Sequence, residues 1–455
     1  MRSDYWRTFG VGDETNDGGN EYLFGDFKYG LDALDKDLWG DDDLIYGGYG
    51  DGAANQRMYG GDGADYISAG HNWAESYTEG GNGNDKYKAP QTIKTSATFK
   101  GGDGDDVVLV AAYGDVASGE ENLLDKFMGQ AGNDVIRGTH KAGAQYLYGG
   151  DGEDKLYGGD GQTDAEKYQV MTGGAGDDWL HGGDGFTGEQ WIYGDTYRKG
   201  EFNMEYDVEN QEWEDNGDDV IYGGSNGAED QLLIGGYGND KIFSGSNNTG
   251  RIRIFGDLRR NLNNPEVVSN LRRGSPQDGD DLIDILDNPD ADGPNTDIQA
   301  FGQGGNDKIF GSIGNDEELY GGDGDDKIWA ENPGQVETEA DVNTIFGGNG
   351  KDIIYGSVMR DRLYGDWQRE YDDETILNDD SENPGKFDTE GDDDIIYTGV
   401  STGTYETGGD YVHGGWGNDK IYGQGTSGHW LNGEFGDDMI WGSEGNDYIY
   451  GDDYN

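Results

Sequence analysis

The tract GGDGDDKIW at residues 321–329 combines two features that suit the binding of a divalent metal ion, a carboxylate and a cluster of glycines. Glycines adopt backbone conformations that other residues avoid, so several carbonyl oxygens can turn toward one point. The aspartate adds a hard anionic oxygen, and calcium takes roughly six to eight oxygen ligands at flexible distances. One such turn is therefore half of a calcium site, and two stacked turns would complete it.

This tract is one copy of an internal repeat. The pattern G-x-x-G-x-D occurs fourteen times in 455 residues, whereas composition alone would give roughly two or three matches. The matches begin at Gly60, Gly80, Gly101, Gly129, Gly149, Gly173, Gly235, Gly302, Gly311, Gly321, Gly347, Gly414, Gly433 and Gly442. Repeats spread this evenly predict one elongated solenoid rather than two or three ordinary domains.

A short strand is predicted after each repeat turn. The three residues after the aspartate would point outward, inward and outward, which is the period of a β-strand. The inward place holds an aliphatic or aromatic residue in thirteen of the fourteen copies, for example Ile67, Leu156 and Ile328. The remaining copy has Glu318 there and Leu319 one residue later, which predicts a one-residue bulge.

The tracts GGDGDDKIW, GGYGNDKIF and GGWGNDKIY resemble the RTX (repeat-in-toxin) nonapeptides of haemolysin-type calcium-binding proteins. The resemblance extends from about Trp39 to Asn455. It implies an all-β fold, a right-handed parallel β-roll or β-solenoid in which nine-residue units form half-turns and several calcium ions lie between successive turns. The ligands that it implies at matching positions are Asp65, Asp85, Asp106, Asp134, Asp154, Asp178, Asp240, Asp307, Asp316, Asp326, Asp352, Asp419, Asp438 and Asp447. The chain departs from the family because most repeats are separated by 20 residues or more, so the roll must carry loops.

Four long insertions share a start and a stop. Each starts with a Y/F-G-D turn, as in LFGDFK at Leu23 and IFGDLRR at Ile254, and ends in an acidic turn before apolar residues. The acidic turns predict four more calcium ligands, Asp43, Asp219, Asp281 and Asp394. The predicted organisation is an N-terminal segment with the first insertion loop (1–38) and a single continuous roll (39–455) with insertions near 196–215, 258–278, 330–342 and 367–390.

Charge limits the partners of this chain. It has 95 acidic and 31 basic residues, a net charge of -64, and such self-repulsion opposes a compact state. One divalent ion in each of the fourteen repeats would neutralise about 28 charges, so folding should depend on metal. The acidity makes nucleic acid or an anionic membrane surface an improbable partner.

The chain contains no long apolar segment. The start, MRSDYWRTFG, contains no apolar segment of a Sec-type signal, and the longest apolar run, 107–113, is too short to span a bilayer. Cysteine is absent, which excludes disulfides and thiolate metal sites. We expect a secreted protein, extracellular or at the cell surface, with no membrane span.

Two sets of side chains leave alternatives open. Tyr or Trp often follows the inward residue, as at Tyr355 and Tyr422, and would form an outer aromatic face that either stabilises a thin roll or contacts protein or glycan. Basic residues such as Arg259 and Arg260 cluster in or near the insertions. They either pair with local carboxylates or hold an assembly together.

Three functions are consistent with these patterns. The first is a calcium-dependent structural protein that forms a surface layer, sheath or filament, as a homo-oligomer or polymer that grows head to tail. The second is an adhesin or glycan-binding module, and the third is the calcium-binding portion of a larger secreted enzyme or toxin. The two G-x-S-x-G matches, at 223–227 and 399–403, lack the strand-turn-helix context of a nucleophile elbow, so we expect no enzyme activity from this chain.

Overall fold

The computed structural model divides the chain into two compact units, one of residues 1–197 and 223–229 and the other of 198–222 and 230–455. The structure describes residues 21–24, 42–48, 55–70, 75–89, 96–109, 123–138, 143–161, 168–195, 217–227, 230–248, 250–257, 279–286, 298–312, 317–331, 342–366, 392–400 and 409–452. The predicted insertions fall almost entirely between these ranges, and Arg259, Arg260 and Asp316 also lie outside the described residues. The continuity of the roll from residue 39 to residue 455 stays a prediction.

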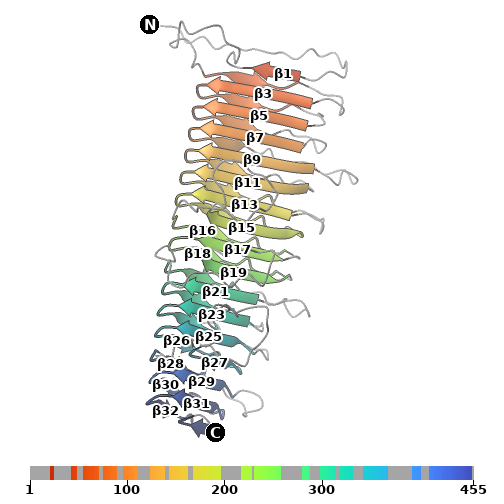
Figure 1. The fold of residues 1–455 in the computed structure, drawn as a ribbon. Helices are drawn as coiled ribbons and strands as arrows, with labels where there is room; N and C mark the ends of the chain where they lie inside the picture. The colour runs from red at the N-terminus through yellow and green to blue at the C-terminus, as the bar shows by residue number, and fades with distance from the viewer. Residues whose placement is uncertain are drawn as a thin grey trace, which may run out of the picture. The chain divides into compact units, whose positions relative to one another are not determined.

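The first unit consists of two parallel sheets whose strands alternate along the chain (Figure 1). One sheet has the longer strands, β1 (Glu21–Phe24), β3 (Asn55–Asp62), β5 (Glu75–Asn82), β7 (Ser96–Asp103), β9 (Leu123–Ala131), β11 (Gly143–Asp151), β13 (Tyr168–Ala175) and β15 (Glu189–Asp195). The other has strands of three residues, β2 (Leu44–Tyr46), β4 (Tyr66–Ser68), β6 (Lys86–Lys88), β8 (Val107–Leu109), β10 (Val135–Arg137), β12 (Lys155–Tyr157) and β14 (Trp179–His181). Each strand pairs with the next strand of its own sheet, so one turn of the roll contains one strand of each kind.

The second unit repeats this design. Its longer strands and their partners are β17 (Gln231–Gly236), β19 (Ile252–Asp257), β21 (Ile298–Gly304), β23 (Glu317–Asp323), β25 (Thr344–Asn349), β27 (Arg362–Tyr364), β29 (Tyr411–Trp416), β31 (Trp430–Phe435) and β33 (Tyr448–Tyr450). Its short strands are β16 (Val220–Tyr222), β18 (Lys241–Phe243), β20 (Leu282–Asp284), β22 (Lys308–Phe310), β24 (Lys327–Trp329), β26 (Ile353–Tyr355), β28 (Ile395–Tyr397), β30 (Lys420–Tyr422) and β32 (Met439–Trp441). Both units are therefore parallel β-rolls, and the predicted fold class is confirmed.

The repeat pattern produces this fold directly. A longer strand ends in the glycine-rich turn, the aspartate follows, and the next three residues form the short strand. The middle residue of the short strand points inward, and Ile67, Leu156 and Ile328 are all fully buried. Side chains of the longer strands, such as Phe99 and Leu319, cover them from the other sheet and are also fully buried. Leu319 is inward as predicted, whereas Glu318 is only half-buried.

Aromatic side chains stack along both sheets of the second unit. On the short strands, Phe310, Trp329, Tyr355, Tyr397, Tyr422 and Trp441 form a column whose ring centroids lie 4.5 to 5.2 Å apart with nearly parallel planes. On the longer strands, Phe255, Phe301, Tyr320, Phe346, Tyr364 and His413 form a second column, which the sequence reasoning missed. Because the ring faces pack on one another, they stabilise the stack of turns.

The described residues contain no helix long and apolar enough to cross a membrane.

Candidate calcium sites

Sixteen of the eighteen predicted aspartates lie in one row within each unit, at the turns between a longer strand and the following short strand. We call this the aspartate row. In the first unit it comprises Asp43, Asp65, Asp85, Asp106, Asp134, Asp154 and Asp178. In the second unit it comprises Asp219, Asp240, Asp281, Asp307, Asp326, Asp352, Asp394, Asp419 and Asp438. The four aspartates predicted from the ends of insertions, Asp43, Asp219, Asp281 and Asp394, thus share this row with the repeat aspartates.

One oxygen of most of these carboxylates joins successive turns. The N–H of Asp65 donates to Oδ1 of Asp85 at 2.7 Å, and the N–H of Asp85 donates to Oδ1 of Asp106 at 2.7 Å. The second unit has the same contact, for example from the N–H of Asp326 to Oδ1 of Asp352 at 2.8 Å. These hydrogen bonds fix the orientation of each carboxylate, because only one of its oxygens is used by the neighbouring turn.

The other oxygen, Oδ2, points into the turn. It is buried and accepts no hydrogen bond in Asp85, Asp106, Asp134, Asp154, Asp281, Asp326, Asp352, Asp394, Asp419 and Asp438. A buried carboxylate oxygen without a donor is costly unless a cation lies beside it. A whole row of such atoms is therefore a strong indication of metal sites.

The backbone supplies further acceptors at the same places. A Cβ added to Gly80 would meet Oδ2 of Asp85 and would lie 2.7 Å from the carbonyl oxygen of Gly101 in the next turn. The same pair of groups, an aspartate Oδ2 and a glycine carbonyl oxygen, surrounds Gly321. Only glycine leaves room at this first repeat position. Among the described residues, no three His, Cys, Asp or Glu side chains gather as a metal-binding group, so carbonyl oxygens must supply part of each calcium shell.

The second repeat position also requires an unusual backbone. Gly81 and Gly322 have φ values of 125° and 124°, and a Cβ on Gly81 would collide with the carbonyl oxygen of Gly61 in the preceding turn. This conformation is nearly free for glycine and unfavourable for other residues. Gln130 (φ 93°), Gln303 (φ 79°) and Glu434 (φ 74°) nevertheless adopt it at the same position.

Electrostatics in this row favour a bound cation. Burial raises the pKa of Asp85 to about 7, that of Asp106 to about 8 and that of Asp326 to about 9. Neighbouring aspartates of the row add to the shift at Asp106 and Asp326. Ionised carboxylates are therefore disfavoured here without a counter-charge, and a calcium ion between turns would supply that charge.

A second, solvent-exposed set of side chains also joins the turns. Oδ1 of Asn84 accepts from the N–H of Asp105 at 3.1 Å, and Oδ1 of Asp105 accepts from the N–H of Asn133 at 2.9 Å. These bonds run in the direction opposite to those of the aspartate row. Sequence reasoning treated this fifth repeat position as variable, although Asn or Asp occupies it in most copies.

The Y/F-G-D turns have a distinct role in the structure. Oδ1 of Asp257 accepts from the N–H of Gly279 at 3.2 Å, and its Oδ2 accepts from the N–H of Gly304 at 3.0 Å. Asp257 precedes the insertion near 258–278 and Gly279 follows it, so this carboxylate ties the two ends of the insertion together. Asp366 makes an equivalent bond, accepting at Oδ2 from the N–H of Trp416.

Asp447 lies elsewhere. Its neighbour Tyr448 pairs with Trp430 on the longer strands, which places Asp447 at the start of β33, outside the aspartate row. Nine residues separate Asp438 from Asp447, so this spacing corresponds to half a turn. The same spacing relates Asp307 to Asp316, where the register of the described residues places Glu317 at the start of β23.

A family model for the RTX calcium-binding nonapeptide repeat matches residues 52–71, 141–162, 170–186, 225–248, 301–332, 337–368, 406–427 and 424–453. No curated protein matches the sequence. Repeats of this family bind calcium, and proteins that contain them are typically secreted. The orphaned Oδ2 atoms, the glycine cradles and the carbonyl oxygens suit calcium, which neutralises the carboxylates and joins the turns when bound. The chain thus contains RTX calcium-binding repeats, which form β-rolls that bind several calcium ions.

Proposed function

We propose that this chain is a secreted structural protein that forms an extracellular surface layer, sheath or filament by association of calcium-loaded copies. The observation that carries the proposal is an exposed apolar patch on β31, β32 and β33. The patch comprises Phe435, Met439, Trp441, Tyr448 and Ile449, which are 43% to 55% exposed. Exposed apolar area of this kind on a very acidic chain marks a surface for association.

One residue of the patch, Ile449, occupies a position that is buried inside the roll in the neighbouring turn. Ile449 pairs in register with Leu431, which is fully buried, yet Ile449 is 48% exposed. Within the described residues, β32 pairs with β30 alone. Within the described residues, an inward side chain and a strand edge are therefore open to a further strand.

A second copy of this chain supplies a matching strand. The β2 segment Leu-Ile-Tyr has the same alternation as the β32 segment Met-Ile-Trp, and Tyr46 of β2 is 50% exposed. Parallel pairing of β2 from one copy with β32 from another would stack Tyr46 on Trp441 and lengthen the aromatic column. The role is structural rather than catalytic. The glycan alternative gains no support from the aromatic column of the second unit, because its ring faces cover one another.

Multi-angle light scattering in calcium and in chelator tests the proposal. We expect large species in calcium, monomers after chelation, and monomers in both conditions for Ile449→Glu. Val400→Glu is the matched control, because Val400 is 60% exposed and lies outside the patch. A wild-type chain that stays monomeric in calcium, or an Ile449→Glu variant that assembles like Val400→Glu, would overturn the proposal.

A further inference from the structure

The start of each longer strand carries a second row of side chains in register with one another. In the first unit the row is Gln56, Ser76, Ala97, Asp125, Gln145, Gln169 and Gln190. In the second unit it is Gln231, Ile252, Ile298, Glu317, Asn343, Asp361, Asp410, His429 and Asp447. This second row lies at the turns that lead from a short strand to a longer strand, and neutral residues fill most of it.

Backbone N–H groups of the next turn face the side-chain oxygens of the glutamines in this row, while Nε2 of Gln190 donates to the carbonyl oxygen of Gly183 at 2.8 Å. The N–H of Gly70 donates to Oε1 of Gln56 at 2.8 Å, and the N–H of Gly183 donates to Oε1 of Gln169 at 2.9 Å. In the aspartate row the next turn instead presents a glycine carbonyl oxygen. An N–H group cannot ligate a cation, so the polarity of these turns is opposite to that of a calcium site.

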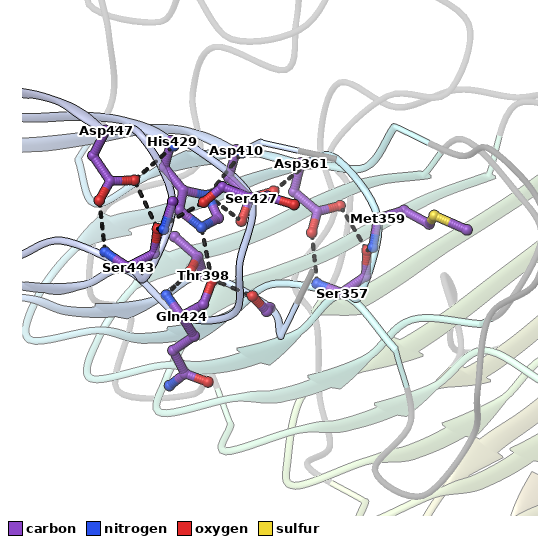
Figure 2. A network of polar contacts seen from close by, with 12 residues as sticks. Ser357, Met359, Asp361, Thr398, Asp410, Gln424, Ser427, His429, Ser443 and Asp447 are labelled. Carbon is purple, nitrogen blue, oxygen red and sulfur yellow. Dashed lines mark hydrogen bonds and ion pairs between the residues drawn. The ribbon is translucent and has the colours of Figure 1, made fainter. Parts of the chain in front are cut away.

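Serines close the turns of Asp361 and Asp447 in the second unit. Oδ2 of Asp447 accepts from the N–H of Ser443 at 2.7 Å, and its Oδ1 accepts from the Ser443 hydroxyl at 2.8 Å. Asp361 has the same arrangement with the N–H and hydroxyl of Ser357, at 2.5 and 3.2 Å (Figure 2). Both oxygens of each carboxylate therefore already have donors, unlike the orphaned Oδ2 atoms of the aspartate row.

A histidine occupies one position of the second row between two aspartates. Figure 2 shows the His429 ring between Asp410 and the Gln424 backbone. Nδ1 of His429 lies 3.3 Å from Oδ2 of Asp410, and Nε2 lies 2.8 Å from the carbonyl oxygen of Gln424. The ring is fully buried and fills this turn with an imidazole in place of a carboxylate.

The residue at the second repeat position distinguishes the two kinds of turn. In the aspartate row it is usually a glycine with positive φ, such as Gly81 or Gly322. In the second row it is Ser357, Ser443 or a glycine such as Gly183, and none of these is among the described residues with positive φ. The serine backbone thus turns its N–H, together with its hydroxyl, toward the carboxylate.

We propose that calcium binds along the aspartate row, and that, apart from the turns of Asp125 and Glu317, side-chain amides, serines and His429 close the second row to calcium. Asp447, although it ends a complete G-x-x-G-x-D repeat, then binds Ser443 and no ion. The Glu317 turn differs from the other turns of the second row. A Cβ on Gly311 would meet Oε2 of Glu317 and the carbonyl oxygen of Ala330, so acceptors face that turn even though Ser312 donates to the carboxylate.

Counting bound calcium by atomic emission after equilibrium dialysis tests this proposal. Asp85→Asn should lower the count by about one ion per chain. The matched substitutions Asp361→Asn and Asp447→Asn should leave the count unchanged. A loss of one ion for either second-row variant, with the fold retained by circular dichroism, would overturn the assignment.

Two further measurements test the proposal without removing a second-row carboxylate. Gln169→Glu puts a carboxylate of the same shape into the second row, and we expect no additional ion because the N–H of Gly183 still faces it. A gain of one ion would overturn the proposed role of the backbone donors. The wild-type count should not exceed one ion per aspartate-row residue plus one each for the turns of Asp125 and Glu317, and a clearly larger number would also overturn the proposal.

Discussion

Asp85→Asn should have opposite effects on stability with and without calcium. The amide keeps an oxygen that can accept from the N–H of Asp65, and its NH2 group would face the carbonyl oxygen of Gly101. In chelator the substitution removes a buried charge whose pKa is raised from 3.8 to about 7 by burial. In the presence of calcium, the substitution removes a carboxylate ligand of the ion.

The sizes of the two stability changes follow from the coupling of proton binding and calcium binding to folding. A pKa raised by about 3 units corresponds to at most about 4 kcal/mol of folding free energy near neutral pH, and solvent screening reduces this to about 1–2 kcal/mol. The calcium-free variant should therefore be more stable than the wild type by about 1–2 kcal/mol. Loss of one site costs about 2.7 kcal/mol when free calcium is about 100 times its dissociation constant.

Urea unfolding followed by circular dichroism, in chelator and in excess calcium, measures both effects. Asp105→Asn is the matched control, because it removes an equal charge from an exposed neighbour whose Oδ1 accepts from the N–H of Asn133. It should change stability little in either condition. The reasoning is refuted if Asp85→Asn destabilises the chain equally in both conditions, or if Asp105→Asn reproduces its effects.

Three other changes have defined outcomes. Gly321→Ala places a methyl group against Oδ2 of Asp326. It should remove about one bound ion and lower the free energy of unfolding in the presence of calcium by about 1–3 kcal/mol. An unchanged ion count by atomic emission would contradict a calcium site beside Gly321. Gln130→Gly relieves a residue with φ of 93° and should raise the free energy of unfolding by about 1 kcal/mol in calcium; a decrease in the urea midpoint would contradict the strain. Without calcium, the free energy of unfolding should fall as pH rises from about 4 to about 8. Burial raises the pKa of Asp106 to about 8, so the folded chain binds more protons than the unfolded chain over this range. A urea midpoint that rises over this range would contradict the burial argument.

Most of the fold could be predicted because the repeat encodes it locally. Each copy specifies its own turn and its own inward residue, so the burial of Ile67 or Ile328 needed no knowledge of other turns. The row formed by Asp43, Asp281 and their counterparts also followed, since each of these residues precedes a short strand in the same way.

The two kinds of turn could not be separated by the same reasoning. Whether Asp447 joins the aspartate row depends on which sheet its strand enters, and the motif is identical in both cases. The nine-residue spacing from Asp438 and the serine at position 443 were the available signals. The place of Gln145 and Gln169 in the second row could not be predicted from the sequence, because their register depends on connections of varying length between turns.

The central claim is that calcium in the aspartate row holds the turns of the roll together. The most direct test is far-ultraviolet circular dichroism of the whole chain during chelation and calcium return. The account predicts that the urea midpoint of the β-sheet spectrum falls strongly near neutral pH as calcium is removed and recovers when calcium is restored. A urea midpoint that is unchanged after complete removal of calcium at that pH would contradict it.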